Sequence, residues 1–157
     1  MLMEKEMNVE YIIREMRQED LDKVTLLEKI CFSQPWKYKD FEDVLTNPHR
    51  VYLTAVTNDG LENIIGGCML TEIVGEGDIS NVAVNPEFRG NHVATSLLDA
   101  ILSYGRERWN IKAFTLEVRS KNEVAIKLYE NAGFESAGIR PNFYDNPKDD
   151  AVIMWLK

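Results

Sequence analysis

Hydrophobic residues recur along the chain with two different spacings, one typical of strands and one of helices, and together they predict a mixed α/β fold. Strand-like runs or alternation cover residues 9–14, 51–56, 63–74, 78–84, 113–119, 134–139 and 151–156. Helical spacing of apolar residues covers residues 20–31, 38–45, 91–108 and 122–132. The predicted order, β-α-α-β-β-β-α-β-α-β-β, differs from the regular alternation of a doubly wound sheet.

The turns between the early strands are short, which predicts that these strands pair in sequence as an antiparallel meander. Asn58-Asp59-Gly60 and Gly75-Glu76-Gly77 are turn sequences between apolar runs. Gly133 follows the last predicted helix, at the position where a left-handed residue commonly ends one. An aromatic, Asn- and Pro-containing loop over residues 140–150 is expected to join the last two strands.

Length and composition fit one globular domain. The chain has 157 residues, of which 45% are hydrophobic, enough for a core without metal or disulfide support. We expect residues 1–7 to form a loose tail and residues 8–157 to form one domain. The beginning of the chain lacks the apolar segment of a signal peptide, and no apolar run reaches the length of a membrane span. These features predict a cytoplasmic protein with no membrane partner.

The balance of charges further limits the classes of molecule that the protein is expected to bind. Eighteen Lys and Arg against 26 Asp and Glu give a formal net charge of -8, which argues against direct nucleic-acid binding. The same charge favours a basic or amine-bearing partner. Two cysteines, Cys31 and Cys68, and two histidines, His49 and His92, are too few for a disulfide framework or a structural metal site.

The segment from Val84 to Ala94 has the features of an anion site. A strand ends, Asn85-Pro86 turns the chain, and a helix begins whose first N–H groups have no partner within the helix. Arg89 lies just before that helix and adds a positive charge. An ordinary loop-to-helix junction has the same outline, so these features alone leave both interpretations open.

The same segment resembles the pyrophosphate loop of the GNAT acetyltransferases, which bind acetyl-coenzyme A (acetyl-CoA) through the pattern Arg/Gln-x-x-Gly-x-Gly/Ala. Arg89 and Ala94 match its ends and Val84-x-Pro86 precedes it, whereas His92 replaces a glycine that lets the backbone approach the diphosphate. We expect a helical, negative φ at His92, with its side chain turned outward. The imidazole is then either an ordinary surface group or a donor to a phosphate.

A second resemblance covers the C-terminal half and is specific to one branch of that family. Residues 116–134 and 140–154 are similar to the branch that acetylates the N-terminal alanine of a bacterial ribosomal protein, the RimI type, and the similarity extends over residues 8–156. It implies the GNAT fold, a twisted and mostly antiparallel sheet with helices on both faces, splayed where acetyl-CoA inserts. The residues that it implies at acetyl-CoA are Val82, Ala83, Val84, Arg89, Gly90, Asn91, His92, Val93, Ala94, Thr95 and Asn122.

Glu117 is the candidate general base. Along the strand over residues 113–119, Thr115, Glu117 and Arg119 share one face, opposite an apolar one. Position alone leaves open a solvated face or a Glu117–Arg119 pair, but the resemblance places the proton acceptor of the RimI type here. An α-amine has a reference pKa of about 7.7–8.0, so its deprotonation at pH 7 costs only about 1 kcal/mol.

Tyr129 is the candidate acid. Its helical spacing from Asn122 and Ala125 fits a core tyrosine, whereas the resemblance places here the tyrosine that donates to the departing sulfur. Asn122 likewise fits both a helix N-cap and a contact to coenzyme A. Tyr144 is a candidate to shape the peptide entrance. Neither cysteine has a base beside it, so no acetyl-cysteine intermediate is expected.

These features predict a transferase that moves an acetyl group directly from acetyl-CoA to a protein N-terminal α-amine, without a metal. By resemblance, the acceptor is the alanine of a small-subunit ribosomal protein. Two alternatives stay open from the sequence. One is a GNAT enzyme for another peptide, a lysine side chain or a small amine, and the other is a non-catalytic acyl-CoA-binding module.

Overall fold

In residues 9–157, which the computed structural model describes, one seven-stranded sheet has the order β1-β2-β3-β4-β5-β7-β6. The tail expected over residues 1–7 lies outside the described residues. The strands are Tyr11–Glu15 (β1), Arg50–Thr57 (β2), Ile64–Ile73 (β3), Glu76–Val84 (β4), Phe114–Arg119 (β5), Glu135–Tyr144 (β6) and Asp149–Leu156 (β7). Neighbouring strands are antiparallel except β4 and β5, which confirms the mostly antiparallel sheet and its N-terminal meander.

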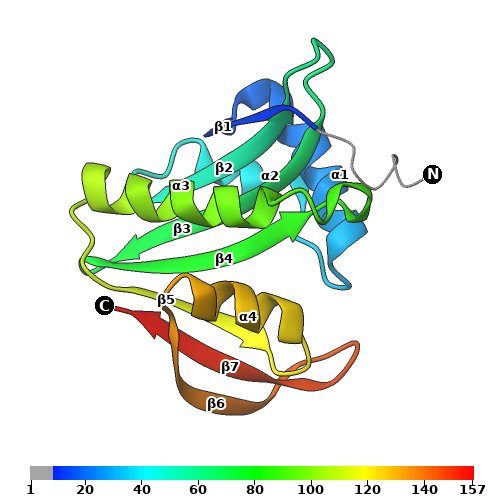
Figure 1. The fold of residues 1–157 in the computed structure, drawn as a ribbon. Coiled ribbons are helices and arrows are strands. Elements are labelled where there is room, and N and C mark those ends of the chain that lie inside the picture. Colours follow the sequence, from blue (N-terminus) through cyan, green and yellow to red (C-terminus); the bar gives the residue numbers. More distant parts are fainter. Residues whose placement is uncertain (1–8) are drawn as a thin grey trace.

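Helices cover both faces of this sheet, as expected (Figure 1). α1 (Leu21–Cys31) and α2 (Tyr38–Val44) lie on one face, and α3 (Val93–Arg108) and α4 (Glu123–Asn131) lie on the other. Two 3-10 turns, η2 (Gln18–Asp20) and η3 (Pro86–Phe88), lead toward α1 and α3. Among the described residues, no helix combines the length and hydropathy that a membrane span requires.

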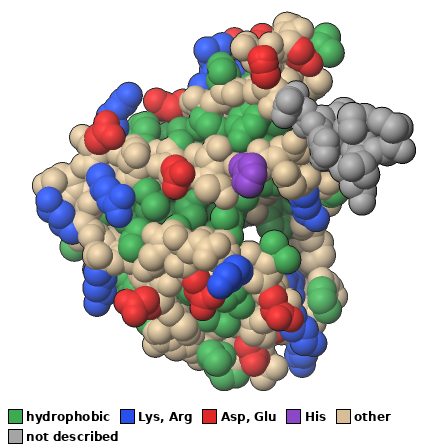
Figure 2. Space-filling model, in the orientation of Figure 1, with side chains coloured by type: hydrophobic (Ala, Val, Ile, Leu, Met, Phe, Trp, Pro, Cys, Tyr) green, Lys and Arg blue, Asp and Glu red, His purple; other side chains and the backbone are tan. Residues whose placement is uncertain are grey.

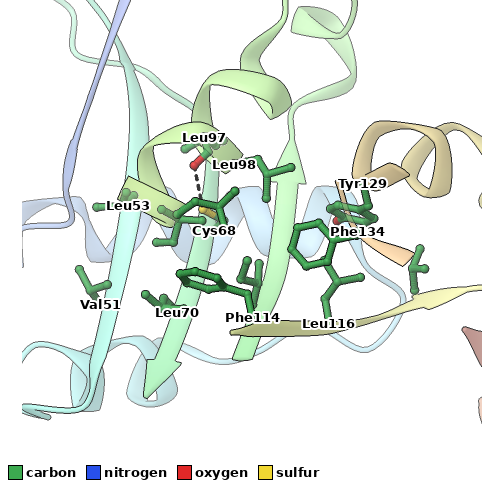
Figure 3. Close-up of a cluster of buried hydrophobic side chains, with 14 of the residues drawn as sticks. Val51, Leu53, Cys68, Leu70, Leu97, Leu98, Phe114, Leu116, Tyr129 and Phe134 are labelled. Carbon is green, nitrogen blue, oxygen red and sulfur yellow. Dashed lines mark hydrogen bonds between the residues drawn. The ribbon is translucent and has the colours of Figure 1, made fainter. Parts of the chain in front are cut away.

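The larger buried cluster lies between the sheet and the α3 and α4 layer (Figure 3). Leu97 and Ile101 of α3 are fully buried, because their spacing puts them on the helical face that packs against the strands. Phe114 and Leu116 of β5 point into the same cluster, and the residues that alternate with them face away from it. The predicted division of β5 into two faces, which puts Glu117 opposite the core, is therefore confirmed.

α3 begins two residues later than the apolar pattern predicts, and the reason is backbone conformation. Gly90 has a φ of 86° and His92 a φ of 60°, both in the left-handed region. A right-handed helix cannot include such residues, so its first residue is Val93. The negative φ expected at His92 is wrong.

The last hairpin also differs from the prediction. β6 does not end near Ile139 but continues to Tyr144, which pairs with Asp149 across a tight turn. The register shifts between Arg140 and Tyr144, and this irregularity accommodates Pro141, which has no N–H for a regular ladder. Most of the expected loop over residues 140–150 is therefore strand.

The sheet opens between its two parallel strands. β4 and β5 pair only from Gly77–Phe114 to Ile79–Leu116. Just beyond Ile79, the register between β3 and β4 shifts and Asn81 takes a positive φ of 53°, which marks a bulge that bends β4. The two strands diverge from that point, and α4 lies beyond the opening (Figure 1).

Candidate active site

A cleft of about 1040 Å³ lies where β4 and β5 separate. Its walls come from the α1–α2 connection, β4, the start of α3, β5, α4 and the β6–β7 turn. Figure 2 shows the surface hollowed between the part that contains α3 and the part that contains α4. The structure brings every predicted site residue onto this cleft except Ala83, which is buried under α1, and Asn91.

The start of α3 gives the cleft a wall of backbone amides without helical partners. The carbonyl of His92 accepts the N–H of Ser96 at 3.0 Å, the first bond of the helix. The N–H groups of Val93, Ala94 and Thr95 therefore have no partner within the helix, and these three residues line the cleft together with Arg89. Such a set of amides, reinforced by the helix dipole and one guanidinium, fits a diphosphate.

The loop before α3 is held by hydrogen bonds that do not involve the cleft. Asn91 donates its side-chain N–H to the carbonyl of Phe88 at 3.0 Å, so it stabilises the loop, and it does not line the cleft. His92 is exposed and lines the cleft from a left-handed backbone. That conformation costs an L-residue about 1–2 kcal/mol. The pyrophosphate-loop pattern therefore has a second reason for glycine at this position, besides the close approach of the backbone to the diphosphate.

Glu117 projects from β5 into the cleft, and its charged neighbour is not the one considered from the sequence. Arg140 Nε of β6 lies 2.9 Å from Glu117 Oε2, although the Nε–H is not aligned for a hydrogen bond to that oxygen. Arg119 instead donates to the carbonyls of Pro147 and Asp145, at 2.6 and 3.0 Å. The Glu117–Arg119 pair is therefore absent, and Arg119 fixes the β6–β7 turn.

Tyr129 is a buried tyrosine, as its helical spacing predicts, and it also lies on the cleft. Its ring is buried against Phe134, with the centroids 5.9 Å apart, and the residue also lines the cleft. Burial raises the pKa of the Tyr129 hydroxyl well above its ordinary value, so the group stays protonated at neutral pH. None of the hydrogen bonds within residues 9–157 involves that hydroxyl, which leaves it available as a donor.

Asn122 caps α4, one of its two predicted roles, and it also lies on the cleft. Its side-chain oxygen accepts the N–H of Ala125 at 3.1 Å and so caps α4. The same residue lines the cleft, beside Ala125 and Tyr129. The cap therefore fixes the start of the helix that carries Tyr129.

Glu28 is a functional candidate that the sequence reasoning missed. It lines the cleft but is only 2% exposed, and Oε2 accepts N–H groups from Trp36 at 3.2 Å and from Asn81 at 3.0 Å. Burial raises the pKa of the Glu28 carboxyl, and Oε1 has no hydrogen-bond partner. The signal in the sequence is a carboxylate inside the apolar stripe of α1, beside Leu27 and Cys31.

The two thiols are unsuited to nucleophilic attack. Cys31 lines the cleft and donates to the carbonyl of Val84 at 3.4 Å, and burial raises the pKa of its thiol. Cys68 is fully buried, and burial raises the pKa of that thiol as well. Both groups are protonated at neutral pH, so neither supplies the thiolate that a covalent intermediate requires.

The open sheet and the helix-start amides beside it fit an acyltransferase that takes its acyl group from a coenzyme A thioester. Residues 13–134 match the model of the acetyltransferase (GNAT) family, so the chain belongs to that family and is an acetyl-CoA-dependent N-acetyltransferase.

Relatives with known sequences and structures extend the similarity over nearly the whole chain. A Bacillus subtilis protein is 33% identical over 151 residues, which are 96% of this chain and 97% of that one. The Escherichia coli ribosomal protein bS18-alanine N-acetyltransferase is 30% identical over 148 residues, 92% of this chain and 95% of that enzyme. The crystal structure of the Escherichia coli ribosomal-protein-S18-alanine N-acetyltransferase matches with a TM-score of 0.82 at 26% identity, covering 93% of this chain and 92% of that one.

Proposed function

We propose that this enzyme acetylates the N-terminal alanine of the small-subunit ribosomal protein bS18, by direct transfer from acetyl-CoA in the cytoplasm. The observation that carries the proposal is that Glu117 and Tyr129 line one cleft, at the point where β4 and β5 separate. Similarity to the Escherichia coli bS18-alanine N-acetyltransferase over 92% of the chain supports the acceptor.

The donor half of the cleft fits acetyl-CoA, which supplies the acetyl group as a thioester when bound. The N–H groups of Val93, Ala94 and Thr95, with Arg89, would hold the diphosphate. Gly90 lines the same wall without a side chain and tolerates its positive φ. Val82 and Val84 line the cleft where β4 has lost its β5 partner, so their backbone would hold the pantetheine.

Glu117 would accept the proton of the attacking amine. The carboxylate lines the cleft from mid-strand, and its side chain is 29% exposed, so solvent and substrate reach it. An α-amine loses its proton at a cost of about 1 kcal/mol at pH 7, against about 4.6 for a lysine, so an ordinary carboxylate suffices as the base. This difference favours an N-terminal acceptor over a lysine side chain.

Tyr129 would donate to the sulfur as it leaves. Its raised pKa keeps the proton on the hydroxyl until negative charge develops on the sulfur, and the buried ring holds the group in place. The hydrogen bond strengthens as the thiolate forms, because a charged acceptor makes the stronger bond. Full proton transfer to the sulfur is uphill, because the raised pKa of Tyr129 lies further above the thiol value of about 8.5, so the hydrogen bond provides the stabilisation and the proton moves last.

The acceptor half of the cleft is lined by the α1–α2 connection and the β6–β7 turn. Residues 31–34 and Trp36 form one side, and Tyr144, Asn146 and Pro147 form the other. Glu28 and Glu117 are carboxylates on this cleft, and the whole chain carries a net charge of -8. A cationic N-terminus of a basic ribosomal protein suits this field, whereas the polyanionic donor depends on the local amides.

The test combines an acceptor panel with one substitution. Acetyl-CoA is supplied with a peptide of the bS18 N-terminus, with the same peptide pre-acetylated at its N-terminus, and with a lysine peptide whose N-terminus is blocked. Thiol release and mass spectrometry are expected to show acetylation of the first peptide only. Modification of lysine, or no transfer to any peptide, would contradict the proposed acceptor.

Glu117→Gln is expected to lower kcat by about 10²–10⁴. The matched control is Glu135→Gln, which changes an exposed glutamate on β6 outside the cleft. An unchanged kcat in Glu117→Gln would remove Glu117 as the base. A comparison of protein N-termini in cells with and without the enzyme then identifies the natural acceptor.

A further inference from the structure

Arg140 and Glu117 meet across an intervening strand. The sheet order is β5-β7-β6, so β7 separates the strand of Glu117 from that of Arg140. Glu117 pairs with Ile153 of β7, and Arg140 pairs with Ala151 of the same strand. The two side chains bridge β7, and Arg140 Nε lies 2.9 Å from Glu117 Oε2.

This contact distinguishes the two oxygens of the Glu117 carboxylate. Oε2 is buried and lies against the guanidinium without an aligned N–H. The hydrogen bonds described for residues 9–157 give Oε1 no partner, and the residue lines the cleft. The carboxylate is thus held through one oxygen, and the other is left for the proton.

Glu117 shares its surroundings with a second carboxylate and a partly buried tyrosine hydroxyl. Asp78 of β4 and Tyr144 of β6 both have a raised pKa, caused first by burial and next by the negative charge of Glu117. Arg119, on the same strand as Glu117, is committed to the carbonyls of the β6–β7 turn and to the ring of Tyr144. Arg140 is therefore the guanidinium that lies in direct contact with the Glu117 carboxylate.

We propose that Arg140 is a positioning residue for the acetyl transfer, which holds Glu117 Oε2 so that Oε1 faces the acceptor amine. The proposal rests on the proposed role of Glu117 as the base. A guanidinium does not deprotonate in proteins, so Arg140 takes no proton itself and acts through the carboxylate. Its side chain is 59% exposed, so its removal leaves the core intact.

The test is a double-mutant cycle on kcat. Arg140→Ala is expected to lower kcat about fivefold, the effect of losing one partly exposed ion pair on the base, while KM for acetyl-CoA stays unchanged. Arg140→Lys keeps the positive charge and is expected to recover part of the loss. In a Glu117→Gln background, Arg140→Ala is expected to change kcat by less than about twofold, because the group that it positions has lost its function.

The control is Arg108→Ala on α3. Arg108 and Arg140 are both exposed arginines that lie over an aromatic ring, Tyr104 at 5.0 Å and Phe143 at 5.7 Å. Arg108→Ala is expected to leave kcat unchanged, and thermal unfolding confirms that each variant is folded. Equal losses from Arg140→Ala in both backgrounds, or a change confined to KM, would overturn the positioning role. An unimpaired Glu117→Gln would instead overturn the proposed base, so the two failures are distinguishable.

Discussion

The hydroxyl of Tyr11 lies 2.9 Å from the Oγ of Ser96, so the first strand of the sheet is tied to the first turn of α3. The same hydroxyl donates to the carbonyl of Asn91 at 3.4 Å. Tyr11 does not itself line the cleft. Tyr11, which lies 80 positions from Asn91 and 85 from Ser96 in the chain, therefore stabilises the loop and first turn of α3 that line the cleft.

Tyr11→Phe is expected to raise KM for acetyl-CoA about two- to tenfold with little change in kcat. The substitution removes hydrogen bonds worth about 0.5–1.5 kcal/mol each and loosens the amides that would hold the diphosphate. Steady-state kinetics with varied acetyl-CoA measures the effect. Tyr38→Phe, at a partly exposed tyrosine of α2, serves as the control. A fall in kcat alone would show that these hydrogen bonds serve something other than donor binding.

Two substitutions at His92 separate backbone strain from the imidazole. His92→Gly relieves a left-handed conformation that costs about 1–2 kcal/mol, offset in part by the extra entropy of an unfolded glycine. We expect His92→Gly to be more stable than His92→Ala by about 1 kcal/mol. We also expect His92→Gly to bind coenzyme A more tightly than the parent protein does. Denaturant unfolding and calorimetric titration measure these differences. If both variants bind coenzyme A more weakly than the parent, the imidazole contacts the phosphates.

The sequence predicts well what depends on local periodicity. Phe114, Leu116 and Val118 alternate with polar residues, so the sequence correctly predicts the face of β5 from which Glu117 projects. The loop at Arg89–Ala94 lies on the cleft, apart from Asn91, as the resemblance to the pyrophosphate loop implies.

What the sequence does not predict depends on contacts between distant segments. Arg140 and Glu117 meet because β7 inserts between their strands, and no local pattern encodes that order. The left-handed φ of His92 also escapes prediction, since the helical pattern continues through that position and only the loop geometry interrupts it. The expected end of β6 near Ile139 is wrong, because a register shift lets the strand continue past Pro141 to Tyr144.

Tyr129→Phe is expected to lower kcat by about 10–100-fold and to leave KM for both substrates within about threefold, because the hydroxyl acts on charge that develops only in the transition state. The raised pKa of Tyr129 keeps the hydroxyl protonated through pH 10, so its ionisation should cause no fall in rate below that pH. Pre-steady-state and pH–rate measurements test both points. Tyr104→Phe is the control, at a tyrosine packed on Trp109 outside the cleft. An alkaline loss of rate below pH 10 that disappears in Tyr129→Phe would contradict this assignment.

Glu28→Gln is expected to change the pH dependence of stability. The folded pKa of Glu28 is raised above the unfolded value of about 4.3, first because the carboxyl is buried. Folded protein therefore keeps a proton that unfolded protein releases, and the parent loses stability as pH rises from about 4.3 through the folded pKa. Glutamine has no such ionisation and still accepts the N–H groups of Trp36 and Asn81.

The expected result is a difference in Tm, variant minus parent, that grows in favour of Glu28→Gln between pH 4 and pH 7. All other titrating groups are shared, so their contributions cancel in the difference. Glu135→Gln, at an exposed position on β6, should give a difference that is flat with pH. A Glu28→Gln difference that is equally flat, or that shrinks as pH rises, would mean that burial does not govern the Glu28 carboxyl, and that its hydrogen bonds to Trp36 and Asn81 outweigh the cost of ionising it.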